Sequence, residues 1–109
     1  MQHWDLRAFE TPRGTRDPRV VHQDEGARAV LLSIDAGQAL GEHQVKENAW
    51  VIVVGGTIEV GTGPHRVDLG PGSLARFEPG ERHSLSSRDG ARILLVLTPW
   101  PGAGHYPSD

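Results

Sequence analysis

Residues 69–87 read LGPGSLARFEPGERHSLSS and contain two tight-turn signals separated by one short run. The first signal is the Gly-Pro-Gly sequence at 70–72, and the second is the Pro-Gly pair at 79–80. Glycine supplies the backbone conformations that tight turns need and proline fixes φ, so such clusters end regular structure. The stretch therefore predicts two short strands, at 73–77 and 82–86, with a turn before each.

The same alternation of short apolar runs and turns continues on both sides of this stretch. Turn signals recur about every ten residues, which is typical of an all-β sandwich or barrel. No segment shows the period of a helix, so little helix is expected. The connections are too short to hold helices, so the strands should pair antiparallel. The remaining strands are expected at 29–35, 39–45, 49–54, 57–60, 65–69 and 92–97.

The composition excludes several classes of protein. The chain has 109 residues, the size of one domain, and no cysteine, so disulfides, thiolate metal sites and cysteine nucleophiles are excluded. A net charge of −3 argues against nucleic acid as a partner. No apolar run is long enough for a membrane helix or a secretory signal. We expect a cytoplasmic single domain with an N-terminal arm (1–27), a β-barrel (28–98) and a C-terminal tail (99–109).

Histidine is the residue type best suited to chemistry in this chain. Neutral imidazole is the commonest protein ligand for divalent transition metals, and its pKa lies nearest neutrality. Without cysteine, a metal site must combine histidine with carboxylate or amide oxygen, which favours iron, manganese, nickel, copper or zinc. Spacing alone selects no pair, because no His-x-His sequence occurs. The six histidines are His3, His22, His43, His65, His83 and His105.

Two stretches place two of these histidines in a recognisable context. The first is GQALGEHQVKENAWVIVVGG, which begins at Gly37 and ends at Gly56. It resembles the first motif of the cupin superfamily, which runs from a glycine through His-x-His and a glutamate to a second glycine. His43 matches the first histidine of that motif. The second histidine position holds Val45, and the glutamate position, counted back from the closing glycine, holds Ala49.

The second stretch is 69–87, and it resembles the second cupin motif, which contains a glycine, a Pro-x-Gly turn, a histidine and an asparagine. Gly72, Gly80 and His83 match that motif. Glu78 stands where the motif has its first proline, and Ser87 stands where it has asparagine. The resemblance covers about residues 30–97 and implies a double-stranded β-helix, or jelly-roll barrel. In cupins the motif histidines and glutamate hold a metal ion, so the resemblance implies His43 and His83 as ligands.

A carboxylate for such a site arises in a second register of the first motif. This register puts Gly41 and His43 on the His-x-His pair and Glu47 on the glutamate. On an unbroken strand, residues 43, 45 and 47 share one face, which would turn Glu47 inward. The alternative is an exposed hairpin that contains Glu47 beside Lys46. An inward Glu47 would complete a two-histidine, one-carboxylate site that suits non-haem iron or a similar metal.

Two functions follow from the resemblance. The first is a metal-dependent enzyme, such as an oxygenase, isomerase or cyclase, that acts on a small organic acid, enol or aromatic, polyketide-like substrate in the barrel. Without a metal, His43 or His83 is the candidate general acid or base in the same cavity. The second is a non-catalytic cupin that binds a small ligand or serves regulation with a vestigial metal site. The substitutions Val45 and Ala49 make the cavity more apolar, which suits an organic ligand.

The resemblance also implies a homodimer, because an open β structure leaves edges and apolar faces that pairing would cover. The candidate seam is the strand 92–97 together with the arm 1–19. Arg76 and Trp50 are expected at the surface and in packing, respectively. The proline-rich segment after residue 98 cannot be a central strand, and it covers a barrel end, covers a partner subunit or is a disordered tail.

Overall fold

The structure of the chain is a computed structural model that describes residues 1–9 and 18–102, apart from the side chains of Glu42 and His43. Within these residues all regular structure is β-strand, as the sequence predicts, and no helix is present. No segment of the described chain therefore forms a helix able to cross a membrane. The strands are β1 (Arg19–Gln23), β2 (Arg28–Ile34), β3 (Ala39–His43), β4 (Asn48–Gly56), β5 (Ile58–Thr62), β6 (His65–Leu69), β7 (Leu74–Phe77), β8 (His83–Ser86) and β9 (Ala91–Thr98).

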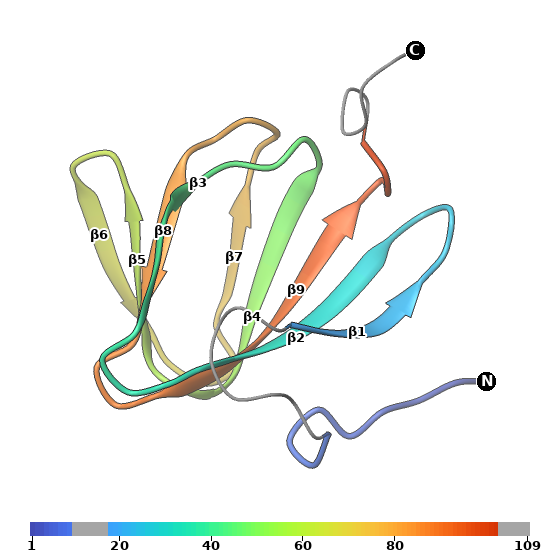
Figure 1. Cartoon of the computed structure of the whole chain (residues 1–109), viewed down its shortest axis with the longest axis horizontal. Coiled ribbons are helices and arrows are strands. Elements are labelled where there is room, and N and C mark those ends of the chain that lie inside the picture. Colours follow the sequence, from blue (N-terminus) through green and yellow to red (C-terminus); the bar gives the residue numbers. More distant parts are fainter. Residues whose placement is uncertain (10–17, 103–109) are drawn as a thin grey trace.

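The strands form two antiparallel sheets that enclose one interior (Figure 1). One sheet has the order β1-β2-β9-β4-β7, and the other has the order β3-β8-β5-β6. Consecutive strands often belong to different sheets, so the chain crosses between the sheets at its turns. The turns therefore gather at the two ends of the barrel. The β3–β4 loop, the β7–β8 turn and the chain after β9 all lie at the end drawn uppermost in Figure 1.

The core lies between the inner faces of the two sheets. In β4, Ala49, Val51 and Val53 are buried while the residues between them are half-buried, as expected for a strand with one face turned inward. β8 shows the same alternation, with His83 and Leu85 buried. His83 is thus placed on the inner face of a strand whose other inward residue belongs to the hydrophobic core.

The outer face of the five-stranded sheet is partly covered by the N-terminal residues 1–9. The Arg92 guanidinium, on β9, donates hydrogen bonds to the carbonyl oxygens of Leu6 and Arg7, at 2.9 and 2.8 Å. The ring of Trp4 lies 5.7 Å from that of His22 on β1. These contacts attach the start of the chain to the β1, β2 and β9 side of the sheet.

Several boundaries differ from the sequence-based expectation, since β4 and β5 each end two residues later than expected, at Gly56 and Thr62. Two further differences concern β1 and β3. β1 adds residues 19–23 to the five-stranded sheet, within the region assigned to an arm. β3 ends at His43, two residues earlier than expected. The physical reason for the second difference is that the Val45 carbonyl accepts a hydrogen bond from the Gly80 amide, at 2.8 Å, and not from a strand of the ladder. The division into arm, barrel and tail otherwise stays a prediction.

β9 is the central strand of the five-stranded sheet, which limits how it could contribute to a homodimer. Both of its edges are used, because it pairs with β2 along one side and with β4 along the other. Only the outward side chains of the strand, such as Leu94 and Val96, remain for a contact with a second copy. The homodimer stays a prediction.

The turn between β1 and β2 is built around one carboxylate. Asp24 accepts hydrogen bonds from the amides of Gly26 and Ala27, at 2.7 and 3.0 Å, and from the His22 ring at 3.2 Å. These bonds, that of Gly26 first, lower the pKa of Asp24 below its ordinary value of 3.8. A pKa that is lower in the folded state stabilises the turn above the ordinary value, and this contribution is lost as the pH falls through the folded value.

We therefore expect the Gly26 and Ala27 amides to exchange hydrogen faster, relative to their intrinsic rates, at pH 2 than at pH 6. The Asp24→Ala variant should show fast exchange at both values, because the acceptor is gone. Equal protection at both pH values in the natural protein would contradict this account of the turn.

Candidate functional site

The ladder between β3 and β8 sets the two motif histidines opposite each other. Residues 43 and 83 are directly paired across the two antiparallel strands, at the end of β3 and the start of β8. Cα atoms of such partners lie about 4.5–5.5 Å apart. The prediction that these two positions become neighbours is confirmed for the backbone. The side chain of His43 lies outside the described residues.

The imidazole of His83 is buried and fixed on two sides. It is 2% exposed, and its ring stacks on that of Phe77 with centroids 3.9 Å apart and planes 7° from parallel. Its Nδ1 lies 3.1 Å from the carbonyl oxygen of Glu81. A carbonyl can only accept, so Nδ1 carries the hydrogen in this contact and Nε2 of the neutral ring has the lone pair. That tautomer presents Nε2 as a ligand or a base.

Glu47 is also buried, which excludes the exposed hairpin considered from the sequence. Its side chain is 1% exposed, and its Oε2 accepts a hydrogen bond of 2.7 Å from the backbone amide of Gly102. The burial of Glu47 does not follow from a shared strand face, because β3 stops at His43 and Glu47 lies in the loop before β4. A buried carboxylate needs such a hydrogen bond, since removing a charge from water is costly.

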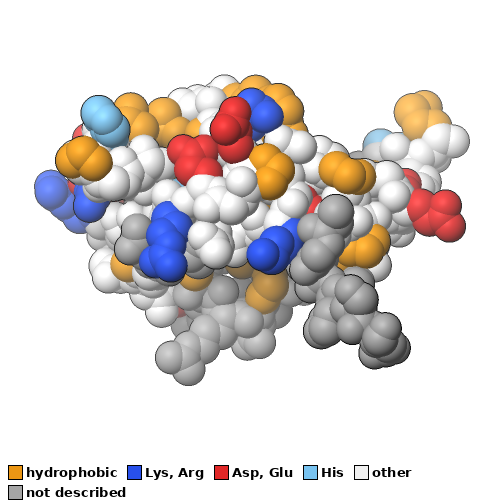
Figure 2. Space-filling view, turned by 90° about the horizontal axis from the view of Figure 1, so that it is seen from above, with side chains coloured by type: hydrophobic (Ala, Val, Ile, Leu, Met, Phe, Trp, Pro, Cys, Tyr) orange, Lys and Arg blue, Asp and Glu red, His pale blue; other side chains and the backbone are white. Residues whose placement is uncertain are grey.

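Three segments meet at this end of the barrel. The β3–β4 loop carries Glu47, the β7–β8 turn leads to His83, and residues 99–102 follow β9. The Gly80 amide donates to the Val45 carbonyl, which ties the first two together, and Gly102 ties the third to Glu47. Figure 2 looks onto this end, where hydrophobic side chains are interspersed with charged ones.

The walls near this region are apolar, as the substitutions in the first motif suggest. Ala49 belongs to the core, and Val45 packs against it.

Ser87, at the asparagine position of the second motif, has a different place. It lies at the opposite end of β8, where its hydroxyl donates to the Thr57 carbonyl and accepts from the Gly90 amide. Ser87 thus links the β4–β5 and β8–β9 turns, and it lies at the other end of β8 from His83.

The weaker candidates lie outside the interior. Arg76 is exposed on the outer face of the five-stranded sheet, 5.6 Å above the ring of Trp50, and it donates to the Asn48 side chain at 2.9 Å. Trp50 is therefore a half-buried packing residue of that face. His65 is exposed, as expected. His105 lies outside the described residues.

The sequence left open that the segment after residue 98 covers a barrel end, but it did not predict the contacts of Trp100 and Gly102. Both are buried, although they follow the last strand in a proline-rich segment. Their signal in the sequence is a tryptophan between two prolines, which marks a segment that is not a strand but does not say what it contacts.

The described side chains include no group of three metal-ligating residues. His83 and Glu47 are buried near the same end, and position 43 pairs with position 83. The third ligand would be the side chain of His43, which lies outside the described residues.

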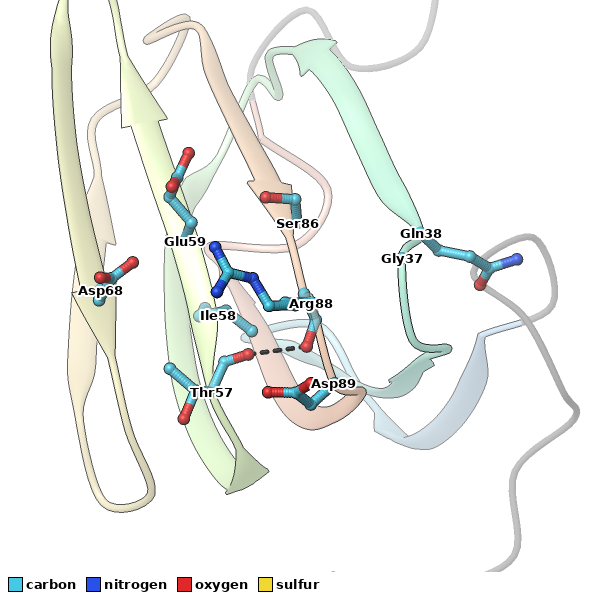
Figure 3. Close-up of a pocket in the computed structure, with 10 residues that line it drawn as sticks. Gly37, Gln38, Thr57, Ile58, Glu59, Asp68, Ser86, Arg88 and Asp89 are labelled. Carbon is cyan, nitrogen blue, oxygen red and sulfur yellow. Dashed lines mark hydrogen bonds between the residues drawn. The ribbon is translucent and has the colours of Figure 1, made fainter.

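A hollow in the described surface lies away from the histidines. It measures about 460 Å³ and is open on the outer side of the four-stranded sheet, between the turns at the opposite barrel end (Figure 3). Glu59 and Asp68, which face each other on β5 and β6, line it together with Arg88 and Asp89. This is a polar surface hollow and not the apolar cavity expected inside the barrel.

Comparison with known proteins places the fold and the motifs in one family. The family model described as "Cupin domain" matches residues 30–98. The chain therefore belongs to the cupin family, and its fold is the double-stranded β-helix. A comparison with curated proteins finds no match.

Solved structures agree on the fold. A conserved protein with a double-stranded β-helix domain from Klebsiella pneumoniae has a TM-score of 0.80 and 18% identity, covering 94% of each chain. An RmlC-like cupin from Desulfovibrio desulfuricans has a TM-score of 0.76 and 19% identity, covering 91% of this chain and 96% of that one. KdgF from Halomonas has a TM-score of 0.72 and 19% identity, covering 84% and 85%. At these identities the likeness concerns the fold.

Proposed function

We propose that this cupin binds a divalent transition metal at the end of its barrel, through His43, His83 and Glu47. The observation that carries the proposal is the register that pairs residues 43 and 83, next to a loop that buries a carboxylate. Two imidazoles and one carboxylate suit iron, manganese, nickel, copper or zinc with open coordination positions.

The described donors fit such an ion. The Glu81 carbonyl fixes the tautomer and the orientation of the His83 ring, which is the usual role of a hydrogen-bond partner behind a metal-ligating histidine. The stack on Phe77 restrains the ring plane. The Gly102 amide plays the corresponding role for the Glu47 carboxylate. The orientation of each proposed ligand, His83 and Glu47, is thus set by a hydrogen bond to a backbone group.

We further propose that the site acts on a small organic acid, enol or aromatic substrate. A bound ion supplies Lewis-acid or oxygen-activating chemistry. Without a bound ion, the Nε2 of His83 is placed to accept a proton, because Nδ1 is committed to the Glu81 carbonyl. Val45, Ala49 and Phe77 provide apolar surroundings that keep water away from the reacting atoms.

Metal content tests the proposal. The natural protein, loaded with Fe²⁺, Mn²⁺, Ni²⁺, Cu²⁺ or Zn²⁺ and then desalted, should retain about one ion per chain of at least one metal. His43→Ala, His83→Gln and Glu47→Gln should each weaken binding by more than the 10–100-fold typical of outer-shell changes. Elemental analysis and titration measure both quantities.

His65→Ala is the matched control, because His65 is exposed on β6, an edge strand that pairs with neither β3 nor β8. It should bind metal as the natural protein does. Circular dichroism of each variant separates loss of ligand from loss of fold. A natural protein that retains none of the five metals, or a site variant that binds as tightly as the His65→Ala control, would refute the proposal.

A non-catalytic cupin is the second candidate, and the burial of Trp100 and Gly102 favours it. These residues are buried, and Gly102 contacts Glu47 directly, which suits a barrel in which no substrate has to reach Glu47. A metal-free protein whose stability is unchanged in His43→Ala would support this alternative.

A further inference from the structure

The segment after β9, residues 99–102, is held down at two points; we call it the C-terminal strap. Trp100 is the first point. It is 7% exposed, it belongs to the hydrophobic core cluster, and the Arg28 guanidinium lies 4.8 Å from the centre of its ring. A buried tryptophan with a cation on its face is a strong anchor for a segment without strand pairing.

Gly102 is the second point, and it fits a space that admits only glycine. A Cβ atom built there would lie 2.8 Å from the Lys46 carbonyl oxygen and 3.1 Å from Glu47 Oε2. This close approach lets the Gly102 amide reach Oε2 at 2.7 Å, in a buried hydrogen bond between residues 55 apart in sequence. An amide bonded to a carboxylate is a charge-assisted contact, and it fixes the direction of the group.

We propose that Gly102 is a positioning residue for Glu47, so that docking of the C-terminal strap and occupation of the metal site strengthen each other. The inference rests on the proposed function, because Glu47 is taken as a ligand. A carboxylate ligand binds well only when its orientation is set by a second contact, and here that contact is the strap amide. Linkage then requires the effect to be reciprocal: an ion that holds Glu47 in place also favours the docked strap.

The first measurement concerns the metal-free protein and is independent of any ion. Hydrogen exchange at the Gly102 amide should be slow in the natural protein and faster in Glu47→Ala, which lacks the acceptor. Exchange that is equally fast in both would overturn the positioning contact itself.

The second measurement is the affinity for Co²⁺, followed by its visible absorption bands. Gly102→Ala forces the strap away from Lys46 and should weaken Co²⁺ binding by 10–100-fold, roughly the range for loss of an outer-shell partner. It should also shift the absorption bands, which report ligand geometry. Saturating Co²⁺ should slow exchange at Gly102 in the natural protein, because the coupling acts in both directions.

Gly70→Ala is the matched control, because no atom lies within 4 Å of a Cβ built at that glycine. It should bind Co²⁺ as the natural protein does. Trp100→Leu is a second variant that loosens the anchor without adding an atom next to Glu47, and it should weaken binding in the same direction. It keeps the test valid if Gly102→Ala does not fold.

The outcomes separate the two proposals. A natural protein that binds no Co²⁺ or any other metal would refute the proposed function. Tight binding in the natural protein with unchanged affinity in Gly102→Ala and Trp100→Leu would refute only the role of the strap. Faster exchange at Gly102 upon metal binding would also refute it, because the strap would then compete with the ion.

Discussion

Replacing Gly56 by alanine is expected to destabilise the barrel by about 3 kcal/mol or more, among the largest effects of a single methyl group. Gly56 has φ +73°, a left-handed conformation that costs an L-residue about 1–2 kcal/mol. A Cβ there would also overlap the Gly90 carbonyl oxygen and lie 2.7 Å from the Ala91 Cα. Because these are backbone atoms, β4 and β9 would have to separate where they pair. Urea unfolding followed by circular dichroism measures the loss.

Gly63→Ala is the matched control for this prediction. Gly63 also has a positive φ, +58°, but nothing lies within 4 Å of its Cβ position. It should therefore lose only the conformational part, about 1–2 kcal/mol. If the two variants lost the same stability, the close approach of β4 to the β8–β9 turn would have no energetic weight, and the explanation would be wrong.

Replacing Phe77 by alanine is expected to cost about 3–5 kcal/mol, the range for removing a buried aromatic ring. Phe77 is 3% exposed, lies in the core and supports the ring of His83. The cavity would open directly beneath that imidazole, so the ring would lose its fixed plane. We expect the unfolding midpoint to fall sharply and any metal affinity to fall with it.

Phe77→Leu separates the two effects. Leucine keeps most of the apolar volume, so the stability loss should be about 1 kcal/mol. It removes the stacked ring, so the orientation of His83 should still be perturbed, and nuclear magnetic resonance of the imidazole detects that change. A His83 signal that is identical in the natural protein and in Phe77→Leu would show that the stack does not hold the ring.

The fold was predictable because its turns are indicated by short local sequences. The Gly-Pro-Gly turn at 70–72 and the Pro-Gly turn at 79–80 bound β7 on both sides, and a strand between two turns requires no knowledge of distant contacts. β1 was missed because its residues, RVVHQ, are short and polar at the ends and follow a segment rich in charge and proline. β1 is a strand because it pairs with β2, and a short polar run does not indicate such a pairing.

The site was predictable only in part. His83 was expected to face the interior, and its burial agrees with the period of β8. The burial of Glu47 could not be derived from strand period, because the strand ends before it. It depends on the Gly102 amide, whose acceptor lies 55 residues earlier in the chain. Backbone donors carry no sequence signature, so contacts of this kind are invisible until the fold is known.

The central position of β9 has a consequence for how the protein is made. β2 and β4 leave the ribosome well before β9, yet neither has its main neighbour until residues 91–98 arrive between them. The five-stranded sheet therefore lacks its central strand until residues 91–98 have been synthesised, and the sheet cannot form before then. Pairings between such distant segments slow folding. Until β9 is made, one edge of β2 and one edge of β4 present unpaired backbone N–H and C=O groups.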